Sequence, residues 1–450
     1  MEETKKKKGL ISIYTGIPLV YRVLTALVLG VIAGLVFGPK IEVVEPLGAL
    51  MLRLLQMVVL PLIFFSIVTG VGGTPASKLG RIAGKIMAFY VGTKIFSTSF
   101  AIIIAKVMKP GAGITLSGAN GAASVVGEGI AAPPISQIFL EIIPNNVVGA
   151  FVEGSFLQVL MFAVFFGLAI SFLKDSKDER VRQTVNTVYD FCEGASEIIF
   201  KITQSVLEYT PIGVFALIAL VFAQDGLAVL GPLGKLVIAC YIGYIFQLTV
   251  VYSSFLKIGG LSPRVFFSKA KDITLMGFAT RSSNSVLPLS LKVSEEDLGI
   301  SNVVGGFTLP LGAQINMDGE AYYQILSVFF IANAIGLNLT FSDQILMILV
   351  VTLGSIGTAG VSGAGPVVLL AVLEMVGIDM SAGTPAAAAF ALILGIDVIL
   401  DMGRTAINVT GDLVGTAIVA NSENMIDKSK WELSPSLEQE EVEKVMGRAN

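Results

Sequence analysis

A row of charged residues inside a long hydrophobic tract constrains this chain more than any other feature. Residues 384–420 are otherwise apolar or small, and the polar positions recur every three or four residues. They are Asp397, Asp401, Arg404, Thr405, Asn408 and Asp412. At that spacing they share one face of one helix. A charge at the centre of a bilayer costs at least about 2.5–3.5 kcal/mol, so this face must meet protein or water. Such residues mark a substrate or ion path, and the structural alternative is an ion-pair network between helices.

The composition indicates a polytopic membrane protein. Of the 450 residues, 54% are hydrophobic and 14% are charged, against roughly 45–50% and 25% in soluble domains. The absence of histidine removes Ser/His/Asp catalysis and histidine metal sites, and also the base that the G-V-S-G stretch at 360–363 would need as a protease. No phosphate-binding G-x-x-x-x-G-K-[ST] pattern occurs, and a net charge of −4 gives no reason to expect nucleic acid. We therefore expect a protein that is not an enzyme.

The first half of the chain contains six hydrophobic stretches, each able to cross a layer of roughly 30 Å. They are residues 17–37, 43–71, 86–107, 149–173, 198–221 and 236–256. Basic clusters return after every second stretch, whereas residues 110–173 hold no Lys or Arg. The positive-inside rule then places the N-terminal tail in the cytoplasm and the loop around 110–146 outside. The C-terminal tail is expected on the cytoplasmic side as well.

The second half predicts two re-entrant helical hairpins. Residues 265–291 are interrupted by T-R-S-S-N-S at 280–285, and residues 345–376 by S-I-G-T-A-G-V-S-G-A-G at 355–365. Each arm is too short to span. A span follows each hairpin, the first broken by I-N-M-D-G-E at 315–320. Two such units that enter from opposite faces are typical of the inverted repeats of secondary transporters. The alternative is that the Gly and Ser positions only pack helices closely. We expect an all-α polytopic membrane protein with eight transmembrane helices and two hairpins.

Four ordered motifs resemble those of the glutamate transporter family, the dicarboxylate/amino acid:cation symporters. They are T-R-S-S-x-S, T-L-P-L-G-A-x-I-N-M-D-G, S-I-G-T-A-G-V-x-G-A-G and D-M-G-R-T-x-x-N-V-T-G-D. The resemblance covers nearly the whole chain and looks closest to archaeal aspartate transporters. It implies a homotrimer in the cell inner (plasma) membrane that imports aspartate, glutamate or a related dicarboxylate. Sodium ions, protons or both would drive transport by an elevator movement. An anion channel is a remote alternative.

The resemblance also divides the chain into a fixed scaffold and a moving transport domain. The scaffold would comprise residues 17–85 and 149–222, and the transport domain residues 86–109 and 223–427. The cytoplasmic tails would be 1–16 and 428–450, and the external loop 110–148.

The chemistry of the row suits an acidic amino acid. Arg404 offers a bidentate fork for a side-chain carboxylate. Asp401 suits the ammonium group, and Asn408 with Ser283 at a helix N-terminus suits the α-carboxylate. The full set implied by the resemblance is Arg281, Ser282, Ser283, Glu320, Val361, Gly365, Asp401, Arg404, Thr405 and Asn408.

The resemblance implies two sodium sites made of oxygen ligands. The first would use Gly312, Asn316, Asn408 and Asp412. The second would use backbone carbonyls of Gln314, Ser355, Ile356 and Thr358. A third site in the family corresponds to Tyr90, Thr93, Lys94, Asn316 and Asp318. Lys94 stands where the family has serine, so we predict that its ammonium replaces that sodium beside Asp318. The alternative is that Lys94 points elsewhere and pairs with another acid.

A second departure is Glu320, where the family usually has threonine. Burial would favour its protonated form, which could donate a hydrogen bond and carry a proton. The alternative is a salt bridge between Glu320 and Arg404 in a transporter of neutral amino acids.

Overall fold

The computed structural model describes residues 17–73, 80–114, 140, 143–354, 363–381 and 383–432. Within these ranges the regular structure is helical, and the one extended pairing is an antiparallel bridge between Ile300 and Ile426. The first half contains α2 (Leu19–Phe37), η1 (Gly38–Val44), α3 (Glu45–Gly72), α4 (Arg81–Met108), α7 (Val147–Glu153), α8 (Phe156–Leu173) and α9 (Glu179–Asp225). Next come η3 (Gly226–Val229), α10 (Leu230–Phe246), η4 (Gln247–Val251) and α11 (Tyr252–Ile258).

The second half consists of paired shorter helices and one long one. They are α12 (Pro263–Thr280), α13 (Ser283–Glu296), α14 (Asn302–Ile315), α15 (Asp318–Ala334), α16 (Phe341–Gly354), α17 (Gly365–Met375), α18 (Pro385–Ser422) and α19 (Lys428–Glu432). The breaks predicted at 280–285 and 315–320 therefore separate helices as expected. The break predicted at 355–365 lies mostly outside the described residues.

Four helical stretches of the described chain are long and apolar enough to cross a membrane. They are Tyr21–Gly72, Arg81–Met108, Glu179–Ile258 and Pro385–Ser422. A helix suits this environment because it satisfies its own backbone hydrogen bonds. The membrane character predicted from composition is thus supported, while the number of crossings stays a prediction.

Three predicted boundaries in the first half differ from the structure. The stretch 149–173 is divided, because Gly154 takes a left-handed conformation (φ +75°) and ends α7 before α8 begins. The stretch 198–221 is only part of the 47-residue α9, whose first turn is capped by Asp178 and whose beginning is polar. The stretch 236–256 contains a π-helical turn at η4. Hydrophobicity alone does not report these local features.

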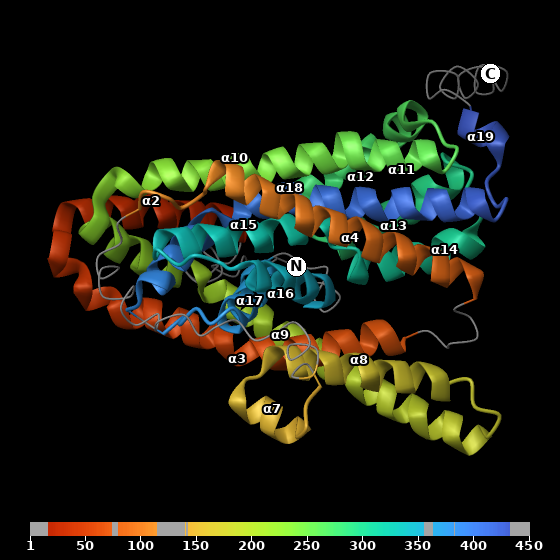
Figure 1. Cartoon of the computed structure of the whole chain (residues 1–450), viewed down its shortest axis with the longest axis horizontal. Coiled ribbons are helices and arrows are strands. Elements are labelled where there is room, and N and C mark those ends of the chain that lie inside the picture. Colours follow the sequence, from red (N-terminus) through yellow and green to blue (C-terminus); the bar gives the residue numbers. More distant parts are fainter. Residues whose placement is uncertain are drawn as a thin grey trace, which may run out of the picture.

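The helices form two groups (Figure 1). In one group α9 packs against α2 and α3, and α3 also packs against α8. In the other, α18 packs against α12, α14 and α15, and α15 packs against α4 and α10. The two groups also contact each other, because α18 packs against α9 and α2, and α17 packs against both α3 and α15.

The last long helix lies at the centre of the second group. Thr384 caps its first turn by accepting a hydrogen bond from Ala387, and Pro385 occupies its first position. The polar row predicted from sequence lies on this single helix and is buried, with Arg404 only 3% exposed. The row therefore faces protein rather than lipid, as expected from the free energy cost of placing charged groups in the bilayer.

Candidate functional site

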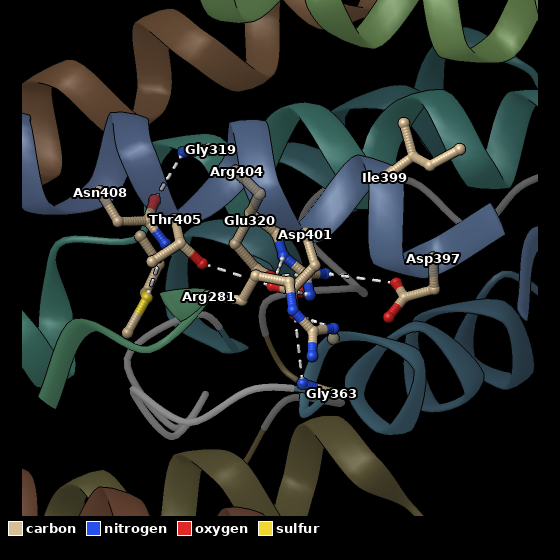
Figure 2. A network of polar contacts seen from close by, with 12 residues as sticks. Arg281, Gly319, Glu320, Gly363, Asp397, Ile399, Asp401, Arg404, Thr405 and Asn408 are labelled. Atoms are coloured by element: carbon tan, nitrogen blue, oxygen red, sulfur yellow. Dashed lines mark hydrogen bonds and ion pairs between the residues drawn. The ribbon is translucent and has the colours of Figure 1, made fainter. Parts of the chain in front are cut away.

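Arg404 lies at the centre of a buried cluster of carboxylates (Figure 2). Its Nη2 donates to Asp401 Oδ1 at 2.7 Å, and its Nη1 lies 3.1 Å from Glu320 Oε2 and 3.9 Å from Asp397 Oδ1. The guanidinium also stacks 4.5 Å from the ring centre of Tyr323. One guanidinium thus meets carboxylates from two helices, α15 and α18.

Asp401 connects this cluster to the tip of the first hairpin. Its Oδ2 lies 3.6 Å from Arg281 Nη1 and accepts a hydrogen bond of 3.4 Å from the backbone of Gly363. Thr405 donates to its Oδ1 at 3.3 Å. Arg281 has a left-handed backbone (φ +56°), which ends α12 and lets Ser282 cap α13 by accepting from Ser285 at 3.3 Å. The tip is therefore positioned by helix capping at both of its arms.

Two glycines make room for the Arg404 cluster. A Cβ on Gly365 would overlap the Arg404 guanidinium, and one on Gly319 would overlap the Arg404 backbone. Gly365 was expected in the site from the sequence. Gly319 was assigned no role, although its position in the broken span N-M-D-G was the available signal.

Asn408 is already engaged in the structure. Its side-chain oxygen accepts a 2.8 Å hydrogen bond from Gly319 N, one of the free amides of the first turn of α15, and its amide nitrogen lies 3.1 Å from Met317 sulfur. Asn408 therefore joins the break between α14 and α15 to the row on α18.

Several buried polar atoms of the cluster lack hydrogen-bond partners among the described residues. They include the Tyr323 hydroxyl, together with Arg404 Nη1 and Asp397 Oδ1, which have ion-pair contacts but no hydrogen bond. Buried polar groups are normally paired, so such atoms indicate a place for a ligand or water. A cavity of about 40 Å³ adjoins Asp397 and is lined also by Arg281 and Gly363.

Three of the four residues predicted for the first sodium site, Gly312, Asn316 and Asp412, come together. Asn316 donates to Asp412 Oδ1 at 2.9 Å, and Gly312 lies so close to Asp412 and Tyr90 that a Cβ would not fit. Asn316 Oδ1 is buried without a hydrogen-bond partner in the described structure. A carboxylate, a free amide oxygen and the end of α14 thus provide hard oxygen donors of the kind that sodium uses.

Part of the prediction lies outside the described residues, namely Val361, Ser355, Ile356 and Thr358. For the second sodium site the structure describes only Gln314, whose side chain donates to Asn284 at the first hairpin tip (3.0 Å).

The third predicted site contains a buried ammonium group. Lys94 is 2% exposed and donates to the Ile315 carbonyl at 2.9 Å. Asp318, Glu320 and Asp412 are buried acids whose negative charges act on this ammonium group. The Asp318 carboxylate accepts from Thr93 at 3.2 Å. These contacts agree with the predicted orientation of Lys94, while its replacement of sodium stays a prediction.

Three side chains that support the site were not predicted from the sequence. Gln247 and Tyr252, at the π-helical turn, each donate to Asp318 Oδ2 at 3.0 Å. Gln324 donates to Glu320 Oε1 at 2.5 Å. Asp397 was noted in the polar row but not assigned to the site. A π-helical turn has no sequence signal in the hydrophobic pattern, whereas Gln324 stands one helical turn after Glu320 and was recognisable.

Broken helices that meet around buried charges, inside an all-helical membrane bundle, are the architecture of secondary transporters. The model of the sodium:dicarboxylate symporter family matches residues 19–422, and the chain belongs to this family. The resemblance seen in the motifs is thereby confirmed. Members of this family are transporters rather than enzymes.

The chain matches several named proteins over nearly the whole length of each. The chain is 31% identical to a proton/sodium-glutamate symport protein of Geobacillus stearothermophilus, over 92% of this chain and 96% of the relative. It is 32% identical to a proton/glutamate-aspartate symporter of Escherichia coli (92% and 94%) and 32% identical to a C4-dicarboxylate transport protein of Bacillus subtilis (92% and 95%). These three are bacterial, and the greater likeness to archaeal aspartate transporters stays a prediction.

Proposed function

We propose that the chain is a symporter that imports an acidic amino acid or a C4-dicarboxylate with sodium ions, protons or both. The observation that carries the proposal is the buried Arg404 guanidinium, whose Nη2 is paired with Asp401 and whose Nη1 lies 3.1 Å from Glu320 but makes no hydrogen bond within the described structure. A planar guanidinium is suited to bidentate binding of a carboxylate. The names of the relatives support the same class of substrate.

The roles follow from charge. Arg404 would bind the side-chain carboxylate of the substrate. Asp401, with Thr405, would bind its ammonium group, while Asn408 and the serines of the first hairpin tip would hold the α-carboxylate. Binding requires the Arg404 fork to exchange its present partners for those of the substrate.

The charge balance gives a reason for cation coupling. Around Arg404 and Arg281, the three carboxylates of Glu320, Asp397 and Asp401 outnumber the guanidinium groups by one. A further carboxylate from the substrate would leave buried negative charge uncompensated, which is costly. A proton on Glu320 would remove that excess and free one side of Arg404. A sodium ion at Asp412 would compensate negative charge near the cluster. The ammonium group of Lys94 would permanently replace the sodium ion of the third site.

The proposal includes the mechanics implied by the family resemblance. Helices α2, α3, α8 and α9 would form the scaffold of a homotrimer in the cell inner (plasma) membrane, with both termini cytoplasmic. Helices α4 and α10 to α18 would move as an elevator. The packing of the helices into two groups supports this division.

A second candidate is a transporter of neutral amino acids. The 3.1 Å approach of Glu320 to Arg404 favours it, because Glu320 then occupies the position of a substrate carboxylate as a permanent anion. Such a protein would bind serine or another small neutral amino acid without a proton.

Uptake into proteoliposomes tests the proposal. Purified protein would be reconstituted and offered labelled aspartate, glutamate, succinate or serine, with inward sodium and proton gradients imposed separately. We expect gradient-driven accumulation of an acidic solute, abolished in Arg404→Ala. Accumulation of serine alone, independent of pH, would favour the second candidate. Ion flux without solute accumulation or counterflow would overturn both and indicate a channel.

A further inference from the structure

The chain returns to the base of the first hairpin after α18 ends. Residues 425–432, which we call the C-terminal strap, run beside the loop that connects α13 to α14. Ser301 N donates to Met425 O at 3.0 Å, Asp427 N donates to Gly299 O at 2.8 Å, and Ile300 bridges Ile426. Figure 1 shows α19, the helix of the strap, at the end of the molecule where α18 finishes. The strap is therefore attached to the open end of the hairpin by backbone pairing.

A buried lysine completes this attachment. Lys269 belongs to α12 and is 6% exposed. Its Nζ donates to the carbonyl of Asp297 at 2.8 Å and to that of Lys430 at 2.5 Å. Asp297 is the C-terminal cap of α13, and Lys430 lies in the last turn of α19. Carbonyls at helix C-termini carry partial negative charge, and a buried ammonium needs such acceptors. One side chain thus joins both arms of the hairpin to the strap.

The strap fits closely where it meets the hairpin. Gly299 has a left-handed backbone (φ +67°), and a Cβ there would lie 2.7 Å from the Asp427 carbonyl. Trp431 is 6% exposed and belongs to the hydrophobic core. Asp427 accepts from the hydroxyl and the backbone N–H of Ser429, and these hydrogen bonds hold the pKa of Asp427 below its usual value. Hydrogen bonds, burial of an apolar side chain and close packing therefore all contribute to this contact.

We infer that Lys269 is a positioning residue, which clamps the base of the first hairpin to the C-terminal strap and so fixes Arg281 and Ser282 at its tip. The helical arm from Lys269 to Arg281 is roughly 18 Å long at 1.5 Å per residue, so movement at the base is transmitted to the tip. Thr274 and Thr410, hydrogen-bonded at 2.8 Å, join the same arm to α18. The first hairpin and α18 then move as one body. The link to solute binding rests on the proposed function; the clamp itself does not.

Hydrogen exchange measured by mass spectrometry tests the clamp. The protein would be purified in detergent without solute, and peptides from 263–296 would be compared with peptides from α4. Lys269→Met keeps the apolar stem and removes the ammonium, so we expect exchange in the hairpin to accelerate at least tenfold while α4 is unchanged. Lys269→Arg should restore slow exchange. Lys271→Met is the matched control, because Lys271 is an exposed residue of the same helix and its loss should have no effect.

A binding measurement then connects the clamp to the site. Whichever solute binds the wild-type protein should bind Lys269→Met at least threefold more weakly, and Lys269→Arg should recover the affinity. If Lys269→Met does not fold, a chain that ends at residue 424 and so lacks the strap should show the same faster exchange in the hairpin and the same weaker solute binding. Unchanged hairpin exchange, or equal acceleration in α4, would overturn the clamp. Faster hairpin exchange with unchanged affinity would overturn its role in positioning the tip. Failure of all tested solutes to bind would contradict the proposed function and leave the exchange result standing as the test of the clamp.

Discussion

Replacing Lys94 by serine should create a sodium site where the protein has an ammonium group. Lys94 and Asp318 are 2% and 0% exposed. The Asp318 carboxylate keeps the hydroxyl groups of Thr93 and Tyr252 and the amide of Gln247 as hydrogen-bond donors in the variant. Its charge, however, loses the buried ammonium group of Lys94 as a compensating cation. The carboxylate and the new serine hydroxyl are oxygen ligands that suit sodium.

The expected magnitudes follow from this burial. Removal of one partner from a buried ion pair costs about 3–5 kcal/mol in the free energy of unfolding. A sodium ion bound only by the folded state, at 100 times its dissociation constant, returns about 2.7 kcal/mol. Lys94→Ser should therefore recover most of its lost stability in saturating sodium. Lys94→Met loses the same charge without supplying an oxygen, so its loss should persist.

Thermal unfolding of the purified variants measures this difference. Each protein would be heated in sodium chloride and in choline chloride at equal ionic strength. The sodium dependence of solute binding would be titrated in parallel. For Lys94→Ser, the slope of log affinity against log sodium concentration should exceed that of the wild type by about one. Equal sodium responses in the wild type, Lys94→Ser and Lys94→Met would refute the view that Lys94 occupies an ion's place.

Two further substitutions test the Arg404 cluster. Uptake of an acidic solute should rise as pH falls, because a protonated Glu320 releases Arg404, and Glu320→Gln should abolish this dependence. Uptake assays over a series of mildly acidic to mildly basic pH values would show it. Unaltered pH dependence in Glu320→Gln would contradict the proton role. Gly365→Ala should weaken solute binding at least tenfold, because its Cβ displaces the guanidinium. Gly84→Ala, with no atom within 4 Å of the added Cβ, is the control; equal binding by both variants would contradict this packing.

The helical breaks could be predicted because their residues have strong local preferences. Ser282 caps α13, and Asn316 with Met317 separates α14 from α15, where the sequence indicated interruptions. The polar row of α18 was equally clear, since charges in a hydrophobic tract have few tolerable places. These features are fixed by capping and by burial, and both can be read from neighbouring residues.

The remaining features depend on tertiary packing. The side chain of Arg281 approaches Asp401, although the sequence only placed Arg281 at the hairpin tip and in the expected binding set. The π-helical turn directs Gln247 and Tyr252 to Asp318, which are separated from it by 71 and 66 residues. Lys269 donates to carbonyl groups at the ends of two other helices. The hydrophobic pattern of the sequence does not show which helix ends lie near this lysine. Contacts of this kind need the positions of several helices at once.

The central claim is that Arg404 forms a cation-dependent binding site for a small acidic solute. Isothermal titration calorimetry on the purified protein tests it most directly, with aspartate, glutamate, succinate and serine titrated with and without sodium at two pH values. We predict that at least one acidic solute binds, that sodium or low pH strengthens its binding, and that Arg404→Ala abolishes it. Binding of an acidic solute that persists in Arg404→Ala, or is indifferent to both sodium and pH, would contradict the account.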